Sequence, residues 1–310
     1  MKYTIPEPAR QAFASTSYIL SHNVYYVNFI AACLHAEYYS ACALRLRLLV
    51  WLYIMQKKSA LLPIAIRLNK VLADAGVCSR RKADELIRNG VVAVNGTVTH
   101  ELGLRVLASD TVSVHGKSIR ASQRRTWLLM NKPVQVLSTV HDPEGRRTVL
   151  DILPDHWKKL RLFPVGRLDY FSEGLLLLTD DGELAHKMLH PSHQVPKVYH
   201  LLVREQPDKN ILQSMRAGMR LTEGEQLAPM KARLLSPSAR LPHFPSHGAL
   251  LEIILFQGVN RQIRRMCRDL QLTVLRLARV AHGAIVLGDI PPGGVRMLND
   301  EEIASLRGIT

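Results

Sequence analysis

The chain has 310 residues, 47% of them hydrophobic, so it suits about two domains and is excluded from the intrinsically disordered class. Lysines and arginines number 41 against 26 acidic residues, which gives a net charge of +15. A surplus of that size predicts a polyanionic partner, because unneutralised like charges repel one another in a compact protein. The four cysteines include no C-x-x-C pair, which excludes a zinc ribbon or disulfide framework and is typical of a reducing cytoplasm.

The first 54 residues differ from the rest of the chain, because they are rich in Tyr, Cys and Leu and show no helical or strand period. The apolar run 41–55 is interrupted by Arg45 and Arg47 and is shorter than the ~20 residues that a membrane-spanning helix needs. Met55, followed by Gln-Lys-Lys, resembles an ordinary cytosolic start. Our hypothesis is that the native chain starts at or near Met55 and that the segment before it is a mis-set start; residues 1–64 as a whole are an atypical N-terminal extension. The alternative is an anchor on a membrane surface.

Residues 65–121 have the pattern of a small module of helices and strands. Apolar residues at helical spacing from Leu68 to Ala75 predict an amphipathic helix that Gly76 ends. Ser79 can cap a second helix, which ends at Gly90. There follow a strand over 91–94, a hairpin turn at Asn95-Gly96, a return strand over 97–99 and a strand over 110–115.

The polar face of these two predicted helices is basic. The cations at 80–82 fall in the first turn of the second helix, where the helix dipole disfavours them, so phosphate is a natural partner. A solvated charged face is the alternative. The string from Arg67 to Gly96 resembles the S4 RNA-binding domain, which implies docking on structured RNA by shape and phosphate contacts. The candidate RNA-binding residues are Arg67, Lys70, Arg80, Arg81, Lys82 and Arg88.

After a polar linker at 121–125, residues 126–310 have the pattern of an α+β domain. Strands dominate this region, so we expect a mixed, mainly antiparallel sheet. Neither G-x-G-x-x-G nor G-x-x-x-x-G-K-[ST] occurs, so no nucleotide cofactor is expected. The predicted strands are 127–132, 134–139, 175–178, 197–204, 232–235, 249–256 and 273–280, and the predicted helices are 183–190, 260–271 and one capped by Asn299.

Three segments of this region carry candidate catalytic residues. In Gly166-Arg167-Leu168-Asp169, which precedes a buried strand, a carboxylate and a cationic partner can meet at a sheet edge. Lys197 and Tyr199 share one face of a strand, where a tyrosine can stack under a base. The helical spacing of Arg261, Arg264 and Arg265 predicts one helical face with an anion between the three cations. Taken singly, the segments also fit a turn aspartate, a core tyrosine and a solvated basic face.

Together the three segments resemble one family. They read G-R-L-D-x-x-S-E-G-L-L-L-L-T-x-D-G, K-x-Y and N-R-Q-I-R-R-M, in that order behind the S4-like module. This arrangement resembles the bacterial ribosomal-RNA pseudouridine synthases of the RsuA/RluB/RluE/RluF group, over about residues 65–307. Residues 257–267 look most like the F-type and residues 142–149 like the B-type enzymes, both of which act on large-subunit RNA. The resemblance implies isomerisation of a specific uridine to pseudouridine in 23S ribosomal RNA, without cofactor, metal or ATP.

The resemblance also implies a role for each matching residue. Asp169 is implied to be the nucleophile or base, attacking uracil C6, attacking ribose C1′ or abstracting a sugar proton. Arg167 is implied to help displace the target base, and Tyr199 to stack on the flipped uracil. Arg264 is implied to pair with Asp169 and hold it ionised. Ile263 would pack on the base and Lys197 would support the site, while Arg261 and Arg265 join the candidate RNA-binding residues.

One position departs from the family pattern, and other readings of the chain stay open. Phe171 replaces the small or polar residue usual beside the nucleophile, which puts the shape of the pocket in doubt. The spacings of His186, His190 and His193, and of His243 and His247, can bind zinc, but no H-E-x-x-H accompanies them and we expect no metal site. The alternatives are a small-subunit (16S) enzyme of this family and a non-catalytic RNA-binding ribosome-assembly protein. We expect a cytoplasmic monomer whose partner is ribosomal RNA in a large-subunit precursor or assembly intermediate, with no membrane.

Overall fold

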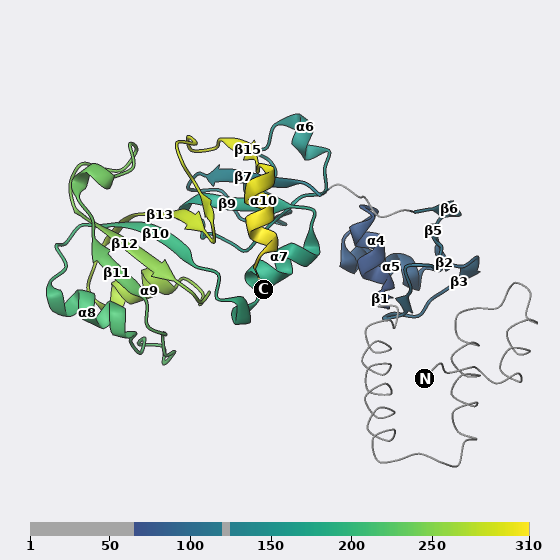
Figure 1. The fold of residues 1–310 in the computed structure, drawn as a ribbon, viewed down its shortest axis with the longest axis horizontal. Coiled ribbons are helices and arrows are strands. Elements are labelled where there is room, and N and C mark those ends of the chain that lie inside the picture. Colours follow the sequence, from purple (N-terminus) through teal and green to yellow (C-terminus); the bar gives the residue numbers. More distant parts are fainter. Residues whose placement is uncertain (1–64, 120–124, 310) are drawn as a thin grey trace, which may run out of the picture. The chain divides into compact units, whose positions relative to one another are not determined.

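The computed structural model describes residues 65–119 and 125–309, which form a small module (65–119) and a larger body (125–309) (Figure 1). The hypothesis about residues 1–64 and most of the predicted linker therefore lie outside the described residues. Across the two described ranges, every helix is too short or too polar to cross a membrane.

The small module contains two packed helices and short antiparallel strands. Its elements are β1 (Ile66–Arg67), α4 (Leu68–Asp74), α5 (Arg80–Arg88), β2 (Val92–Val94), β3 (Thr97–Val98), β4 (Arg105–Val106), β5 (Val112–Val114) and β6 (Lys117–Ser118). Ser79 caps α5 as predicted, because its side chain accepts a hydrogen bond from the Lys82 amide. Asn95 and Gly96 both have positive φ, which is the backbone of a tight hairpin turn between β2 and β3.

The body is built on one nine-stranded sheet in the order β11-β12-β10-β13-β9-β7-β15, with β14 beside β13 and β8 beside β9. Its strands are β7 (Trp127–Lys132), β8 (Phe163–Pro164), β9 (Glu173–Thr179), β10 (Lys197–Val203), β11 (Lys231–Leu234), β12 (Ala249–Leu255), β13 (Val274–His282), β14 (Ile285–Val286) and β15 (Val295–Met297). Neighbours are antiparallel except β9 and β13, which are parallel at the centre. The predicted α+β domain with a mixed, mainly antiparallel sheet is confirmed.

Helices and loops cover both faces of this sheet. The helices are α6 (Asp155–Lys158), α7 (Gly182–Leu189), α8 (Lys209–Ala217), α9 (Gln262–Asp269) and α10 (Asp300–Arg307), with short 3-10 turns η1 (Pro191–His193) and η2 (Pro237–Ala239). Leucines of β9 alternate between two cores: Leu175 and Leu177 pack with α7 and α10, while Leu176 and Leu178 pack with the loops between β7 and β9. In Figure 1, α8 and α9 lie beside the other half of the sheet, where they form a third core with β10, β11 and β12.

The predicted strand over 134–139 is wrong. The segment turns away after Pro133, and Gln135 has a φ of 62°, which an extended strand does not adopt. Its polar groups turn instead toward residues 168–170: the Gln135 amide donates to the carbonyl of Tyr170, and Ser138 bonds the backbone of Leu168. Val136 is buried in the core behind β7, and the segment pairs with another only at the isolated bridge between Leu137 and Thr148.

The predicted helix over 260–271 is shorter than expected. Arg261 takes a left-handed backbone, with a φ of 49°, and α9 begins only at Gln262. The prediction that Arg261, Arg264 and Arg265 lie on one helical face is therefore wrong for Arg261, because a left-handed residue interrupts the helical spacing.

Candidate active site

A cavity of about 720 Å³ opens beside the centre of the sheet. That volume lies within the usual range for sites that bind small organic ligands. Its lining comes from the loop before β9, the start of β10, the end of α7 and the loop between β12 and α9. Of the predicted site residues, the lining includes Arg167, Asp169, Lys197, Tyr199, Arg261 and Ile263.

The pairing of three strands brings these distant segments together. Tyr199 of β10 lies opposite Arg279 of β13, and Arg279 lies opposite Gly174 of β9. The chain just before Gly174 is the Asp169 loop (residues 166–172), so this loop ends beside the tyrosine. Lys197 and Tyr199 both line the cavity, in agreement with the alternation of side chains along a strand.

The backbone of the Asp169 loop is anchored at each carbonyl from residue 168 to residue 172. Ser138 Oγ donates to the carbonyl of Leu168 (3.0 Å), and Lys132 Nζ donates to the carbonyls of Asp169 (3.2 Å) and Ser172 (2.7 Å). The backbone N–H of Gln135 donates to the carbonyl of Tyr170 (2.7 Å), and Arg264 Nη2 donates to that of Phe171 (2.7 Å). Because each carbonyl has a partner, the loop holds one backbone conformation and presents Asp169 at a defined place.

Lys132 is the main internal anchor of this loop. It is fully buried at the end of β7, and its ammonium donates to the carbonyls of Pro133, Asp169 and Ser172. A charged ammonium has three N–H donors, so these three carbonyls use all of them. Burial lowers the pKa of Lys132 to about 8, although the nearby charges of Glu173 and Asp169 act in the opposite direction.

Arg264 joins α9 to the Asp169 loop. Its Nε lies 3.8 Å from Asp169 Oδ2, while its Nη2 donates to the Phe171 carbonyl and to Ser172 Oγ. Burial lowers the pKa of Arg264, and the carboxylate of Asp169 raises it. A cation is thus held next to the one carboxylate of the loop.

A second pair of basic residues lies on the floor of the cavity. Arg279 is buried and donates from Nε to the Leu175 carbonyl, while Lys197 donates to the Val195 carbonyl. Burial lowers the pKa of Lys197, and the neighbouring charge of Arg279 lowers it further. Both side chains line the cavity.

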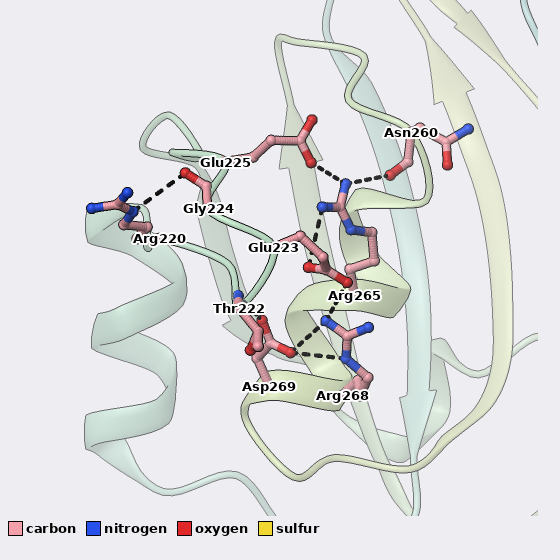
Figure 2. Close-up of polar contacts among 9 residues, drawn as sticks. All are labelled: Arg220, Thr222, Glu223, Gly224, Glu225, Asn260, Arg265, Arg268 and Asp269. Carbon is pink, nitrogen blue, oxygen red and sulfur yellow. Dashed lines mark hydrogen bonds and ion pairs between the residues drawn. The ribbon is translucent and has the colours of Figure 1, made fainter.

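Arg265 has a different environment from Arg264. Figure 2 shows its guanidinium bound by Glu223 and Glu225, with the Glu223 pair at 3.2 Å. Arg268 pairs with Glu223 and also with Asp269 of its own helix, so the loop that carries Glu223 and Glu225 is tied to α9. Arg265 does not line the cavity, because carboxylates of this chain already occupy its donors. The three arginines therefore do not face one another: Arg261 lines the cavity, Arg264 contacts the Asp169 loop and Arg265 binds Glu223 and Glu225.

The basic residues of the small module are mostly solvent-exposed. Lys70 is half-buried, whereas Arg67, Arg80, Arg81, Lys82 and Arg88 are exposed. Lys82 pairs with Glu85 one turn along α5 at 2.6 Å, and Arg80 donates to Asn69. The helix itself thus compensates part of the charge at its first turn, and the other exposed arginines stay available for phosphate.

Sequence reasoning missed four residues of the site: Lys132, Gln135, Ser138 and Arg279. Lys132 carries no signal in the sequence, because a lysine at the end of a strand is usually exposed, whereas here it is fully buried. Gln135 and Ser138 carry no signal either, since the residues that they bind are about 30 positions away.

The histidines form no metal centre among residues 65–119 and 125–309, where no group of three or more His, Cys, Asp or Glu residues could hold an ion. His190 bonds Ser192, and His243 bonds the buried carboxylate of Glu173, which also receives a bidentate pair from Arg276.

Lys132 leads to a prediction on stability and pH. Its ordinary pKa of 10.5 is lowered to about 8 in the folded protein, so between these values the unfolded chain binds more protons. The free energy of unfolding should therefore rise with pH across this window. We measure melting temperatures by calorimetry and take the difference between the wild type and Lys132→Met. This difference should rise by a few degrees between pH 7 and pH 10. Lys158→Met, which removes an exposed lysine of α6, is the control; a slope equal to the control contradicts the prediction.

Comparison with known proteins adds to this geometry. The S4 domain model matches residues 66–112, and the RNA pseudouridylate synthase model matches residues 126–269. The chain is 39% identical over 243 residues to ribosomal large subunit pseudouridine synthase B of Bacillus subtilis, covering 78% of this chain and 96% of the relative.

Two further relatives and one solved structure are similar to this chain. An uncharacterized RNA pseudouridine synthase of Aquifex aeolicus is 41% identical over 244 residues, covering 78% of this chain and 93% of the relative. Ribosomal large subunit pseudouridine synthase B of Pseudomonas aeruginosa is 36% identical, covering 78% and 61%. A crystal structure of a pseudouridylate synthase superposes with a TM-score of 0.55 at 24% identity, covering 78% and 99%, and shows the shared fold.

Proposed function

This chain belongs to the RNA pseudouridylate synthase family, and from that membership we propose that it isomerises a specific uridine to pseudouridine in 23S ribosomal RNA. The observation that carries the proposal is the cavity in which Asp169, Tyr199 and Arg167 meet, with Arg264 beside the carboxylate. The large-subunit target is supported by the names of the relatives from Bacillus subtilis and Pseudomonas aeruginosa.

In the proposed reaction the bond between uracil N1 and ribose C1′ breaks, and the detached uracil rotates. A bond from uracil C5 to C1′ then forms, the proton leaves C5, and N1 ends protonated. The product is an isomer of the substrate, so no atom is added, no electron acceptor is needed and no cofactor enters. Asp169 acts as the nucleophile or base of this sequence.

We assign roles to the neighbouring side chains from where they lie around the cavity. Arg167 is exposed at the cavity and occupies the gap that the flipped nucleotide leaves. Tyr199 is half-buried on the cavity wall and stacks on the uracil, while Ile263 packs against the base. Arg264 holds Asp169 ionised, and Lys197 supports the site from the start of β10.

RNA outside the site is held by phosphate contacts. We assign the S4 domain to residues 65–121 and the catalytic domain to residues 126–310. The exposed arginines of α5 and the cavity-lining Arg261 contact phosphates. Arg265 is left out of this set, because Glu223 and Glu225 bind it. The enzyme acts as a monomer on ribosomal RNA in the cytoplasm, on a large-subunit precursor or assembly intermediate.

The proposal is tested by mapping pseudouridines in ribosomal RNA from a strain that lacks the gene. Primer-extension stops after carbodiimide treatment should show one pseudouridine lost from large-subunit RNA. A plasmid copy of the wild-type gene should restore it, and a plasmid copy with Asp169→Asn, expressed at the same level, should not.

Two different outcomes of this mapping would point to the alternative functions. Loss of a site in small-subunit RNA would move the target to 16S RNA. Ribosomal RNA with a complete set of pseudouridines would contradict the enzymatic proposal and favour a non-catalytic ribosome-assembly protein.

A further inference from the structure

Phe171 is an aromatic side chain left in solvent beside the site. It is 57% exposed, although it lies two residues after Asp169 in a loop whose flanking residues Leu168 and Ser172 are buried. Burying the exposed part of a phenylalanine side chain is favourable, so this ring gains free energy from a partner that covers it. It does not line the cavity, so the ring lies outside the space that would receive the target base.

The backbone under Phe171 is rigid. Its carbonyl accepts a hydrogen bond of 2.7 Å from Arg264 Nη2, and the carbonyls on either side accept bonds of 2.7 Å from the Gln135 amide and Lys132 Nζ. The ring packs edge-on against Tyr170, with centroids 5.0 Å apart and an interplanar angle of 82°. A ring held in this way is ordered before binding, which lowers the entropy lost when a ligand stacks on it.

The charges around Phe171 identify the kind of partner. The guanidinium that holds its carbonyl is the one that lies 3.8 Å from Asp169, and the exposed Arg167 belongs to the same loop. An exposed apolar ring in a loop that also carries an exposed arginine is a combination that binds unpaired nucleic acid, because a base stacks on the ring while phosphates meet the cation. An apolar protein partner would gain nothing from these cations.

We propose that Phe171 is a second base-binding residue, on which an unpaired base next to the target uridine stacks while the target itself occupies the cavity. This inference rests on the proposed function, because it takes RNA as the substrate. Stacking of this kind is present both before and during reaction, so it contributes to KM and leaves kcat unchanged.

The first test measures kinetics with large-subunit RNA transcribed with [5-³H]uridine, by tritium release. Phe171→Ala should raise KM about 5- to 150-fold with kcat unchanged, the range expected for one stacked base. Phe171→Tyr and Phe171→Trp should keep the wild-type KM. Phe171→Leu, which is apolar but has no π-face, should behave like Phe171→Ala. Met297→Ala, which truncates an exposed apolar side chain of β15, is the control.

The second test is independent of turnover. The Phe171→Trp variant carries a fluorophore at the proposed stacking position, and addition of the unlabelled RNA should quench its emission relative to the wild type. Quenching together with weaker RNA binding by Phe171→Ala, in a protein that releases no tritium, would sustain the stacking role and reject the proposed function. If the protein turns over normally, either of two results overturns the stacking role: a wild-type KM for Phe171→Ala or Phe171→Leu, or no quenching of Phe171→Trp by RNA.

Discussion

Asp169→Asn is expected to abolish pseudouridine formation while leaving RNA binding nearly intact. The amide has the size of the carboxylate but is neither nucleophilic nor basic. The variant therefore lacks the group that acts as nucleophile or base in the proposed reaction. Loss of a positioned base alone costs about 10²- to 10⁴-fold in rate, and loss of a covalent nucleophile costs at least as much. The loop should keep its conformation, because its anchors donate hydrogen bonds to backbone carbonyls, which the substitution leaves in place.

The measurement is tritium release from [5-³H]uridine-labelled large-subunit RNA, with RNA retention on filters measured in parallel. Asp155→Asn, the same chemical change at an exposed position of α6, is the matched control and should match the wild type in both assays. Turnover by Asp169→Asn within tenfold of the wild-type rate would contradict the assignment of Asp169. Loss of RNA binding would show that the carboxylate has a structural role.

Gly174→Ala is expected to destabilise the catalytic domain severely. Gly174 has a φ of +98°, and a Cβ there would lie 2.3 Å from the Arg279 carbonyl oxygen and 2.7 Å from its amide nitrogen. These atoms belong to β13, the parallel neighbour of β9 at the centre of the sheet. The added methyl group can be accommodated only by separating the two strands, so we expect a loss of about 3 kcal/mol or more in the free energy of unfolding.

Gly224→Ala separates the steric clash from the backbone strain. Gly224 has nearly the same φ, +96°, but an added Cβ there would have no atom within 4 Å outside the adjacent residues of the chain. Only the conformational cost of a positive φ applies there, about 1–2 kcal/mol. Calorimetric melting temperatures should therefore fall much further for Gly174→Ala than for Gly224→Ala. Equal decreases in the two variants would refute the close-packing argument.

The geometry of the site depends on strand pairing at Gly174, which lies at the centre of the sheet. Asp169, Tyr199 and Arg279 come from three different segments, and only the pairing of β9, β13 and β10 places them around one cavity. A change that separates β9 from β13 would move the carboxylate relative to the tyrosine. Gly174 is thus part of the framework of the site, although it has no side chain to act in it.

Local patterns predicted most elements because local interactions decide them. Ser79 caps α5 and Asn299 caps α10 by hydrogen bonds to amides three residues away, so the capping residue and helix start are encoded together. The apolar run at 175–178 predicted a buried strand, and β9 is buried along its whole length. The residues Asp169, Lys197 and Tyr199 were identified by motif order, and all three line the cavity.

The tertiary structure alone decided how the Asp169 loop is held and which arginines reach it. Lys132 meets the loop because β7 pairs with β9 in a register that sets Lys132 opposite Gly174. Arg264 and Arg265 are adjacent in sequence, yet one binds the Asp169 loop and the other binds Glu223 and Glu225. The sequence by itself determined most elements and pointed to the candidate site residues, because the patterns behind both depend on near neighbours. The contacts that orient those residues join positions about 30 to 90 apart, so they depend on sheet register and on the packing of α9.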